Sequence, residues 1–252
     1  MSMCGIEEEH QGEIKATRLG HACFLVDLPS VPSLGRSTRV PLDPVFSDMC
    51  SPTQSFGPKR YTAPLCKIED MPEVDAVVIP LDNHTLSTLF KRVRGPHIFA
   101  PLGNAKHLGS IGAPTGHAHA RLVGRSTRRD TRQVVQVDLY TCGTLPAGGV
   151  HDQGKTLWSS WAVEGEGKKV YFAETGPAFK EIGEHFGEFD LAMILIGYVL
   201  SFVFLSPMMW VLTTEEVTKP PKRLTEECRK IGIEDDFAPL YRFAPLTAIL
   251  SV

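Results

Sequence analysis

Short apolar runs separated by polar segments mark the first half of the chain. Residues 74–79 (VDAVVI) and 97–103 (HIFAPLG) have the length and composition of strands that are buried on both faces. Between them, the apolar residues of segment 85–94 recur at the spacing of one helical face. Strand, helix and strand in this order predict a βαβ unit. Residues 15–28 predict another strand, with a bend at Gly20 and His21.

The second half has the pattern of antiparallel strands. Residues 132–142 and 157–165 predict two of them, and Glu166 to Lys168 predict a hairpin turn into a third strand at 169–174. Residues 177–190 predict an amphipathic helix whose apolar side chains face inward.

The chain as a whole therefore predicts an α/β sandwich. A last helix is expected at 224–231, after two consecutive prolines, and residues 109–132 show no clear period. Residues 1–13 are expected to be a polar tail, and residues 14–252 a single domain.

One apolar segment, residues 191–212, contains no charged residue and is long enough to cross a bilayer. Pro207 and the lack of flanking lysine or arginine disfavour a spanning helix. We expect a buried strand at 191–196 and an exposed apolar loop at 201–212. The alternative is a lipid-binding protein that is anchored in a membrane through residues 191–212.

Composition narrows the functional classes. The formal net charge is −3, which gives no reason to expect a nucleic-acid partner. The N-terminal residues lack the apolar centre of a secretory signal, and the six cysteines are scattered without C-x-x-C spacing. We therefore expect reduced thiols in an intracellular, cytoplasmic protein.

Several stretches occur together in the order of one known family. The sequences are LGHACFLVD, LDPVFSDMCSPTQSFGPKRY, CKIEDMPEVDAVVI, KTLWSSWAVEGEGKKVYFAETG, PAFKEIGEHFGEFDLAMILIG and PPKRLTEECRKIGIEDDF. Between residues 15 and 236 the chain resembles the N-acyl-phosphatidylethanolamine-hydrolysing phospholipase D family of the metallo-β-lactamase superfamily. This resemblance implies a four-layer αββα sandwich with two zinc ions, which activate water to cleave a phosphodiester of a membrane phospholipid.

The metal-ligand positions that the resemblance implies are mostly lost. The family carries H-x-H-x-D-H after the strand at 74–79, whereas this chain has PLDNH, in which only His84 matches. Glu174 stands near the position of the aspartate that bridges the metals, Met209 replaces a histidine, and the segment with the last ligand is absent, so the sandwich is expected to be incomplete in its C-terminal half. Because a zinc site needs at least three protein ligands, we expect weak or absent zinc binding.

Other residues are candidates for replacing these ligands. His117 and His119 have H-x-H spacing, which places both imidazoles on one face of a strand, and His151 follows the block that has lost its histidine. The resemblance implies that His21 and Asp43 lie close to the site without binding metal directly.

Three hypotheses therefore remain. The first is a zinc phosphodiesterase of this family, with impaired catalysis and possible substrates among membrane phospholipids at a membrane surface. The second is a non-catalytic binding protein on the same fold, and the third is the membrane-anchored protein described above. The number of retained ligands favours the second over the first, and the oligomeric state stays open.

Overall fold

The structure is a computed structural model. It describes residues 12–20, 23–31, 35–48, 63–78, 83–92, 96–101, 104–112, 118–121, 124–126, 136–147, 156–173, 179–194, 226, 229–230, 232 and 247–250. All structural statements below concern these residues.

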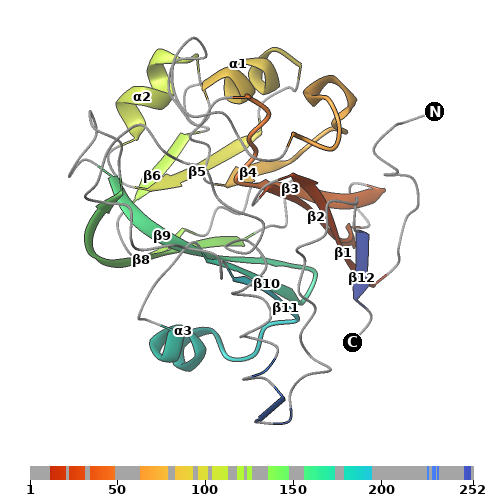
Figure 1. Ribbon diagram of the computed structural model, residues 1–252, viewed down its shortest axis with the longest axis vertical. Helices are drawn as coiled ribbons and strands as arrows, with labels where there is room; N and C mark the ends of the chain where they lie inside the picture. The colour runs from red at the N-terminus through yellow and green to blue at the C-terminus, as the bar shows by residue number, and fades with distance from the viewer. Residues whose placement is uncertain are drawn as a thin grey trace.

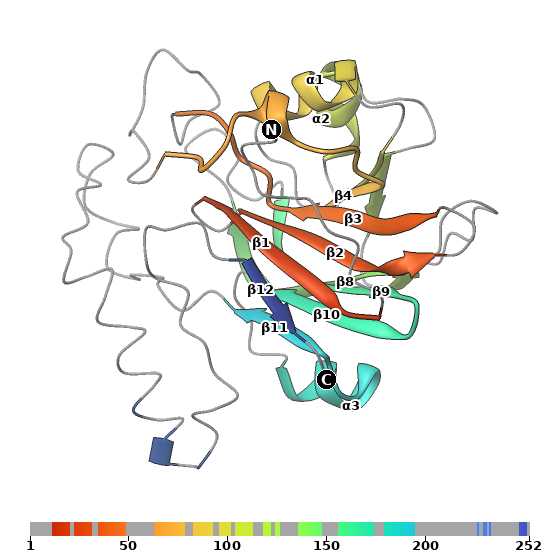
Figure 2. The same cartoon turned by 90° about the vertical axis from the view of Figure 1, so that its right-hand side faces the viewer.

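Seven strands form the first sheet, in the order β12-β1-β2-β3-β4-β5-β6. Their bounds are β1 Ile14–Gly20, β2 Cys23–Val31, β3 Arg36–Leu42, β4 Ala76–Val78, β5 His97–Pro101, β6 Ala118–Arg121 and β12 Thr247–Leu250. The strands from β3 to β6 pair in parallel, whereas β12, β1, β2 and β3 pair antiparallel. The end of the described chain thus lies beside its first strand (Figure 2).

Five strands form the second sheet, in the order β11-β10-β9-β8-β7. Their bounds are β7 Gly124–Ser126, β8 Gln136–Ala147, β9 Thr156–Gly165, β10 Lys168–Ala173 and β11 Leu191–Ile194. A tight turn at Glu166 and Gly167 joins β9 to β10, and both residues have the positive φ angles that such a turn needs.

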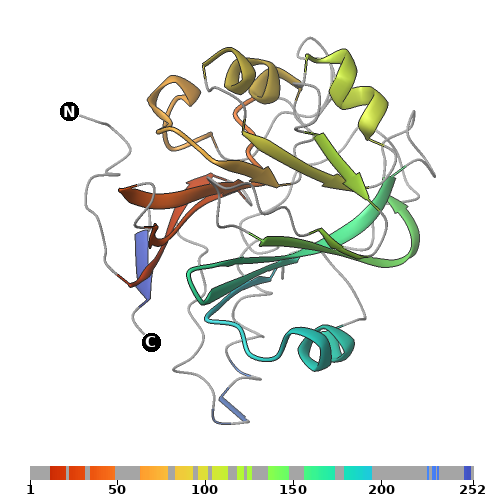
Figure 3. The same ribbon diagram turned by 180° about the vertical axis from the view of Figure 1, so that it is seen from behind.

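The two sheets stack face to face, with helices on the outer sides. Helix α1 (Asn83–Arg92) and helix α2 (Ala105–Ser110) cover the first sheet, together with the 3-10 helix η1 (Ile68–Asp70). Helix α3 (Phe179–Phe186) covers the second sheet (Figures 1 and 3). This arrangement is the αββα sandwich that the resemblance implies.

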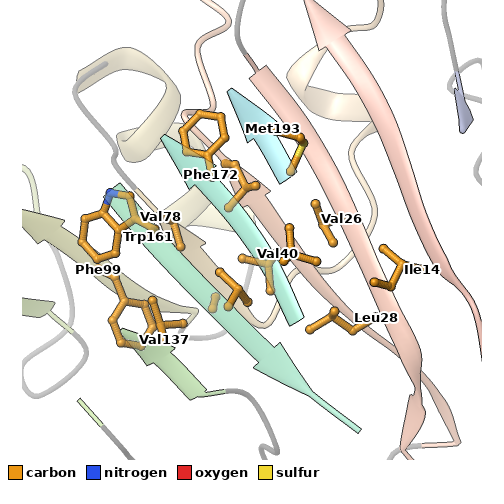
Figure 4. Packing of buried hydrophobic residues seen from close by; sticks show 14 residues of the cluster. Ile14, Val26, Leu28, Val40, Val78, Phe99, Val137, Trp161, Phe172 and Met193 are labelled. Carbon is orange, nitrogen blue, oxygen red and sulfur yellow. The ribbon is translucent and has the colours of Figure 1, made fainter. Parts of the chain in front are cut away.

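The strand alternation of the sequence explains both core layers. Val26 and Leu28 of β2 face the second sheet and belong to the same buried cluster as Trp161 and Phe172, whose packing Figure 4 shows. Leu25 of β2 points the opposite way and joins the cluster under α1 and α2. Because helices and a second sheet cover the two faces, β4 and β5 are buried on both, as their sequence predicts.

Most of the expected elements are confirmed. The βαβ unit is present as β4, α1 and β5, and the hairpin of β9 and β10 and helix α3 lie where the sequence predicts them. The predicted strand at 15–28 is two strands, β1 and β2.

Other expectations need correction or lie outside the described residues. Segment 109–132 contains β6 and β7, two short strands without a readable period. The strand expected at 191–196 is described to Ile194, and it is not fully buried, because Ala192 is exposed at the sheet edge. The loop at 201–212 lies outside the described residues, and so does most of the helix at 224–231. Within the described part of the chain, no helix has the length and apolar character needed to cross a membrane.

Candidate functional site

The carboxyl ends of β3 and β4 bring Asp43 to one edge of the sheet. Leu42 pairs with Val78 at the end of both strands, and the backbone N–H of Asp43 donates to the carbonyl oxygen of Val78 at 2.9 Å. Asp43 has a φ of 44°, so the chain turns sharply where it leaves β3. In α/β sheets ligands bind at such strand ends, so this edge is where a functional site is expected.

Helix α1 begins beside the same edge. The buried hydroxyl of Thr85 accepts a hydrogen bond of 2.9 Å from the backbone N–H of Phe46, which fixes the segment after β3 against the first turn of the helix. His84 lies next to Thr85 in this turn, and its side chain is exposed.

A cavity of about 480 Å3 lies between this turn, the residues after β3 and the segment around η1. Its apolar wall consists of Phe46, Pro64, Leu65 and Ile68. The cavity is partly open to solvent, and its volume is within the range of small-molecule sites.

Polar side chains complete the lining of this cavity. They are Cys66, Lys67, Glu69, Asp70 and His84. Cys66 is half-buried and contacts the core cluster under α1, whereas Lys67 and Glu69 are exposed.

The segment that carries most of these residues is fixed to the end of β1. The backbone N–H of Leu65 donates to the carbonyl oxygen of Leu19 at 2.7 Å. Gly20 has a φ of 137°, and a Cβ atom there would lie 3.1 Å from the Cα atom of Pro64. Glycine is therefore needed at position 20 both for its backbone conformation and for the close approach of the two segments.

The structure describes only some of the residues that the sequence singled out. His84 lines the cavity, and Asp43 is half-buried at the strand ends. His119 lies in β6 and pairs with Phe99 of β5, but its side chain is outside the description. His21, His117, His151, Glu174 and Met209 lie outside the described residues, so their assigned roles stay predictions.

The described residues do not fit a zinc site. Among them, no group of three or more histidine, cysteine, aspartate or glutamate side chains is arranged to hold a metal ion. The segment after the strand at 74–79 is PLDNH, which contains one histidine, His84, where the family motif H-x-H-x-D-H has three.

Two ion pairs of the first sheet are structural. Arg36 binds Asp75 through two hydrogen bonds of 2.7 and 2.8 Å, which raise the pKa of the guanidinium, and Arg39 binds Asp27 at 2.9 Å. Burial raises the pKa of Asp27, and the hydrogen bond and charge of Arg39 offset only part of that effect. Both pairs join neighbouring strands of the first sheet rather than lining the cavity.

Comparison with known families gives a match over most of the chain. Residues 38–226 match the family described as the beta-lactamase superfamily domain. The chain belongs to the β-lactamase superfamily. The family origin agrees with the sandwich and with the resemblance seen in the sequence blocks.

Curated relatives of this superfamily member include a lipid hydrolase. The chain is 37% identical over 196 residues to N-acyl-phosphatidylethanolamine-hydrolyzing phospholipase D 1 of Caenorhabditis elegans. The aligned region covers 72% of this chain and 53% of that protein. An uncharacterized protein of Mycobacterium tuberculosis is 35% identical over 191 residues, covering 71% and 47% of the two chains. The chain thus spans about half the length of these relatives.

Solved structures with a similar fold are more distant. A CmlA beta-hydroxylase E377D mutant matches with a TM-score of 0.47 and 17% identity, covering 73% of this chain and 35% of that one. A putative zinc-dependent hydrolase of the metallo-β-lactamase superfamily from Thermotoga maritima matches with a TM-score of 0.30 and 17% identity, covering 84% and 71%.

Sequence reasoning found His84 but missed the cavity around it. Phe46 and the segment from Pro64 to Asp70 lie in proline-rich stretches that indicate only an ordered loop. The family blocks contain Phe46 and residues 66–70, yet only the lining of the cavity reveals that the two stretches meet.

Proposed function

We propose that this protein is a catalytically impaired, intracellular relative of N-acyl-phosphatidylethanolamine-hydrolysing phospholipase D, with membrane phospholipid as its substrate or ligand. The relationship is supported by 37% identity to such an enzyme over 72% of the chain. The impairment is supported by one observation above all: the segment PLDNH after the strand at 74–79 has one histidine, His84, where the family motif has three.

We expect that the remaining candidate ligands do not replace the missing set. His84 is exposed on α1, and the predicted partner Glu174 is one methylene longer than the aspartate it replaces. A shift of this size in the position of a catalytic group costs about a hundredfold in rate. We therefore expect turnover close to the background, even with added zinc.

The test is release of phosphatidic acid from an N-acylated ethanolamine phospholipid in mixed micelles. Wild type, His84→Ala and Glu174→Ala are compared, with Glu184→Ala on α3 as a control on the opposite side of the sandwich. Equal background release from all four proteins supports the proposal. Robust wild-type turnover that either of the first two substitutions abolishes, but the control does not, would refute the impairment.

Zinc content gives an independent measurement. After dialysis against metal-free buffer, we expect elemental analysis to find well below the two zinc ions per chain of a complete family site. A content near two would contradict this prediction and would direct attention to His117, His119 and His151 as ligands.

A non-catalytic binding protein is the second candidate. The observation that favours it is the cavity beside His84, which is formed and lined with polar groups although the described residues hold no metal-ligand cluster. Binding of vesicles that contain the phospholipid, without release of phosphatidic acid, distinguishes this function from the first.

A further inference from the structure

We propose that Cys23 and Cys66 are a redox-sensitive pair, and that oxidation joins them in a disulfide between β2 and the segment before η1. Both side chains are thiols in the structure. The inference goes beyond the proposed function, because this link needs neither a metal ion nor a phospholipid.

The pairing of β1 with β2 sets the direction of the Cys23 side chain. Cys23 stands opposite Gly20 in this antiparallel pair. Residues that stand opposite each other project to the same face of a sheet, with Cβ atoms about 4.5–5.5 Å apart. A Cβ atom at Gly20 would lie 3.1 Å from the Cα atom of Pro64 and 3.7 Å from the backbone nitrogen of Leu65. The Cys23 side chain is therefore on the face of the sheet that the segment before Cys66 approaches.

The segment that carries Cys66 is held against the same strand end. The backbone N–H of Leu65, the residue before Cys66, donates to the carbonyl oxygen of Leu19 at 2.7 Å. Cys66 packs against the buried cluster under α1, and Cys23 is a member of that cluster together with Leu25 of its own strand. Both thiols thus enter one layer, between the first sheet and the elements that cover it.

The two thiols differ in exposure, and this difference sets the order of reaction. Cys66 is half-buried and lines the partly open cavity, whereas Cys23 is 1% exposed. A peroxide that enters the cavity therefore meets Cys66 first. In thiol oxidation of this kind, the more accessible cysteine is oxidised and a neighbouring cysteine resolves the product.

With hydrogen peroxide as the oxidant, the two steps balance. The Cys66 thiolate attacks one peroxide oxygen, so that an S–O bond forms, the O–O bond breaks and hydroxide leaves. The Cys23 sulfur then attacks the sulfur of the Cys66 sulfenic acid, an S–S bond forms and the S–O bond breaks. Two thiols and one peroxide become one disulfide and two water molecules.

The link would act on the wall of the cavity beside His84. A disulfide forms where the two Cα atoms can approach within about 7 Å. The contacts of Pro64 and Leu65 with the end of β1 already hold the chain just before Cys66, so only a short stretch has to adjust. Oxidation would remove the Cys66 thiol from the lining and tie this segment to β2, while both sheets stay in place.

Peptide mapping of the full chain tests the link. The reduced protein is treated with hydrogen peroxide, remaining thiols are blocked with iodoacetamide, and the monomer is digested without reductant for mass spectrometry. We expect the Cys23 and Cys66 peptides to appear joined, two hydrogen atoms lighter than their sum, and to separate with dithiothreitol. Links to Cys4, Cys50, Cys142 or Cys228 in the same digest are the internal control.

Two variants test the order of the steps. In Cys23→Ser the sulfenic acid of Cys66 has no resolving thiol, so labelling of Cys66 by dimedone should rise several-fold over the parent chain. In Cys66→Ser the buried Cys23 should stay reduced at a peroxide concentration that oxidises the parent. If either variant fails to fold, the digest of the parent chain decides alone.

Three results from the parent chain would overturn the inference. One is a Cys66 that is oxidised beyond the sulfenic acid while Cys23 remains a thiol. Another is a Cys66 that pairs with a different cysteine, and the third is peroxide treatment that leaves both thiols intact. Since no lipid is used, the proposed function can fail while this inference stands, and the reverse.

Discussion

The ion pair of Arg36 and Asp75 offers a sharp test of how the sheet positions the candidate site. Asp75 precedes β4, and its side chain is 7% exposed, whereas the side chain of Arg36 on β3 is 25% exposed. Asp75 accepts two hydrogen bonds from the guanidinium of Arg36 and one of 2.9 Å from the backbone N–H of Arg39. The carboxylate therefore ties β4 to β3 at the opposite end from Asp43.

The cost of Asp75→Ala follows from these contacts. Removing one partner of a buried ion pair costs about 3–5 kcal/mol, because the other charge loses its compensation. Arg36 is partly exposed, so water can solvate part of its charge, and we lower the expected loss to about 2–4 kcal/mol of unfolding free energy. Asp75→Asn keeps an acceptor for Arg39 and should give an intermediate loss.

Glu73→Ala is the matched control, because Glu73 also pairs with Arg36. Its carboxylate is 4.0 Å away and its side chain is 66% exposed, so the substitution should change stability by less than about 0.5 kcal/mol. Urea unfolding of the three variants and the parent chain, with equal m values, measures the differences. If Asp75→Ala and Glu73→Ala lower the free energy of unfolding by the same amount, the ion pair of Arg36 and Asp75 does not hold β3 against β4.

Three further substitutions test the contact of Gly20 with Pro64, helix α3, and the segment that leads into β11. Gly20→Ala should destabilise the fold by about 1–3 kcal/mol and speed Cys66 alkylation, because position 20 has a positive φ and Pro64 is too close for a Cβ atom. Gly183→Ala on the exposed face of α3 should instead stabilise the fold by about 0.5–1 kcal/mol. Thermal unfolding in which both substitutions shift the melting temperature in the same direction would contradict this pair of predictions. Burial raises the pKa of Asp190, but the backbone N–H of Lys169 and the amine of Lys168 outweigh it, and the pKa is lowered overall. Since the pKa of Asp190 is lower in the folded state than in the unfolded state, ionised Asp190 stabilises the fold above about pH 4, and this stabilisation is lost as pH falls through the folded-state pKa. Asp190→Asn should therefore reduce the loss of unfolding free energy below about pH 4, as measured by urea unfolding. An unchanged dependence of stability on pH would refute a stabilising role of the Asp190 carboxylate.

The parts of the fold that were predictable are those with strong local patterns. The apolar runs before Val78 and after His97 identify β4 and β5, because strands covered on both faces have few polar positions. The hairpin of β9 and β10 was readable from Glu166 and Gly167. In contrast, β6 and β7 contain glycine, arginine and histidine, and they form through pairing with β5 and β8 rather than through their own sequence.

The candidate site was predictable only as far as the family pattern reached. His84 and Asp43 were found because they match positions of known blocks, but nothing local to Cys66 or Phe46 indicates a cavity. A cavity depends on contacts between segments that are distant in the chain, such as Leu65 with Leu19. Sequence periodicity reports the burial of one segment against the rest and carries no information on which loops meet.

The fold and a zinc site of this family differ in how many residues each depends on. The described framework depends on many distributed contacts, including the intersheet cluster that contains Trp161 and Val26 and the ion pair at Asp75, so changes in a few loop residues leave it in place. A zinc site depends on a few side chains that act together, so the loss of two histidines from the family motif is expected to remove most of its affinity while β4 and α1 remain in place. A retained fold is therefore compatible with the weak or absent zinc binding that we predict for this chain.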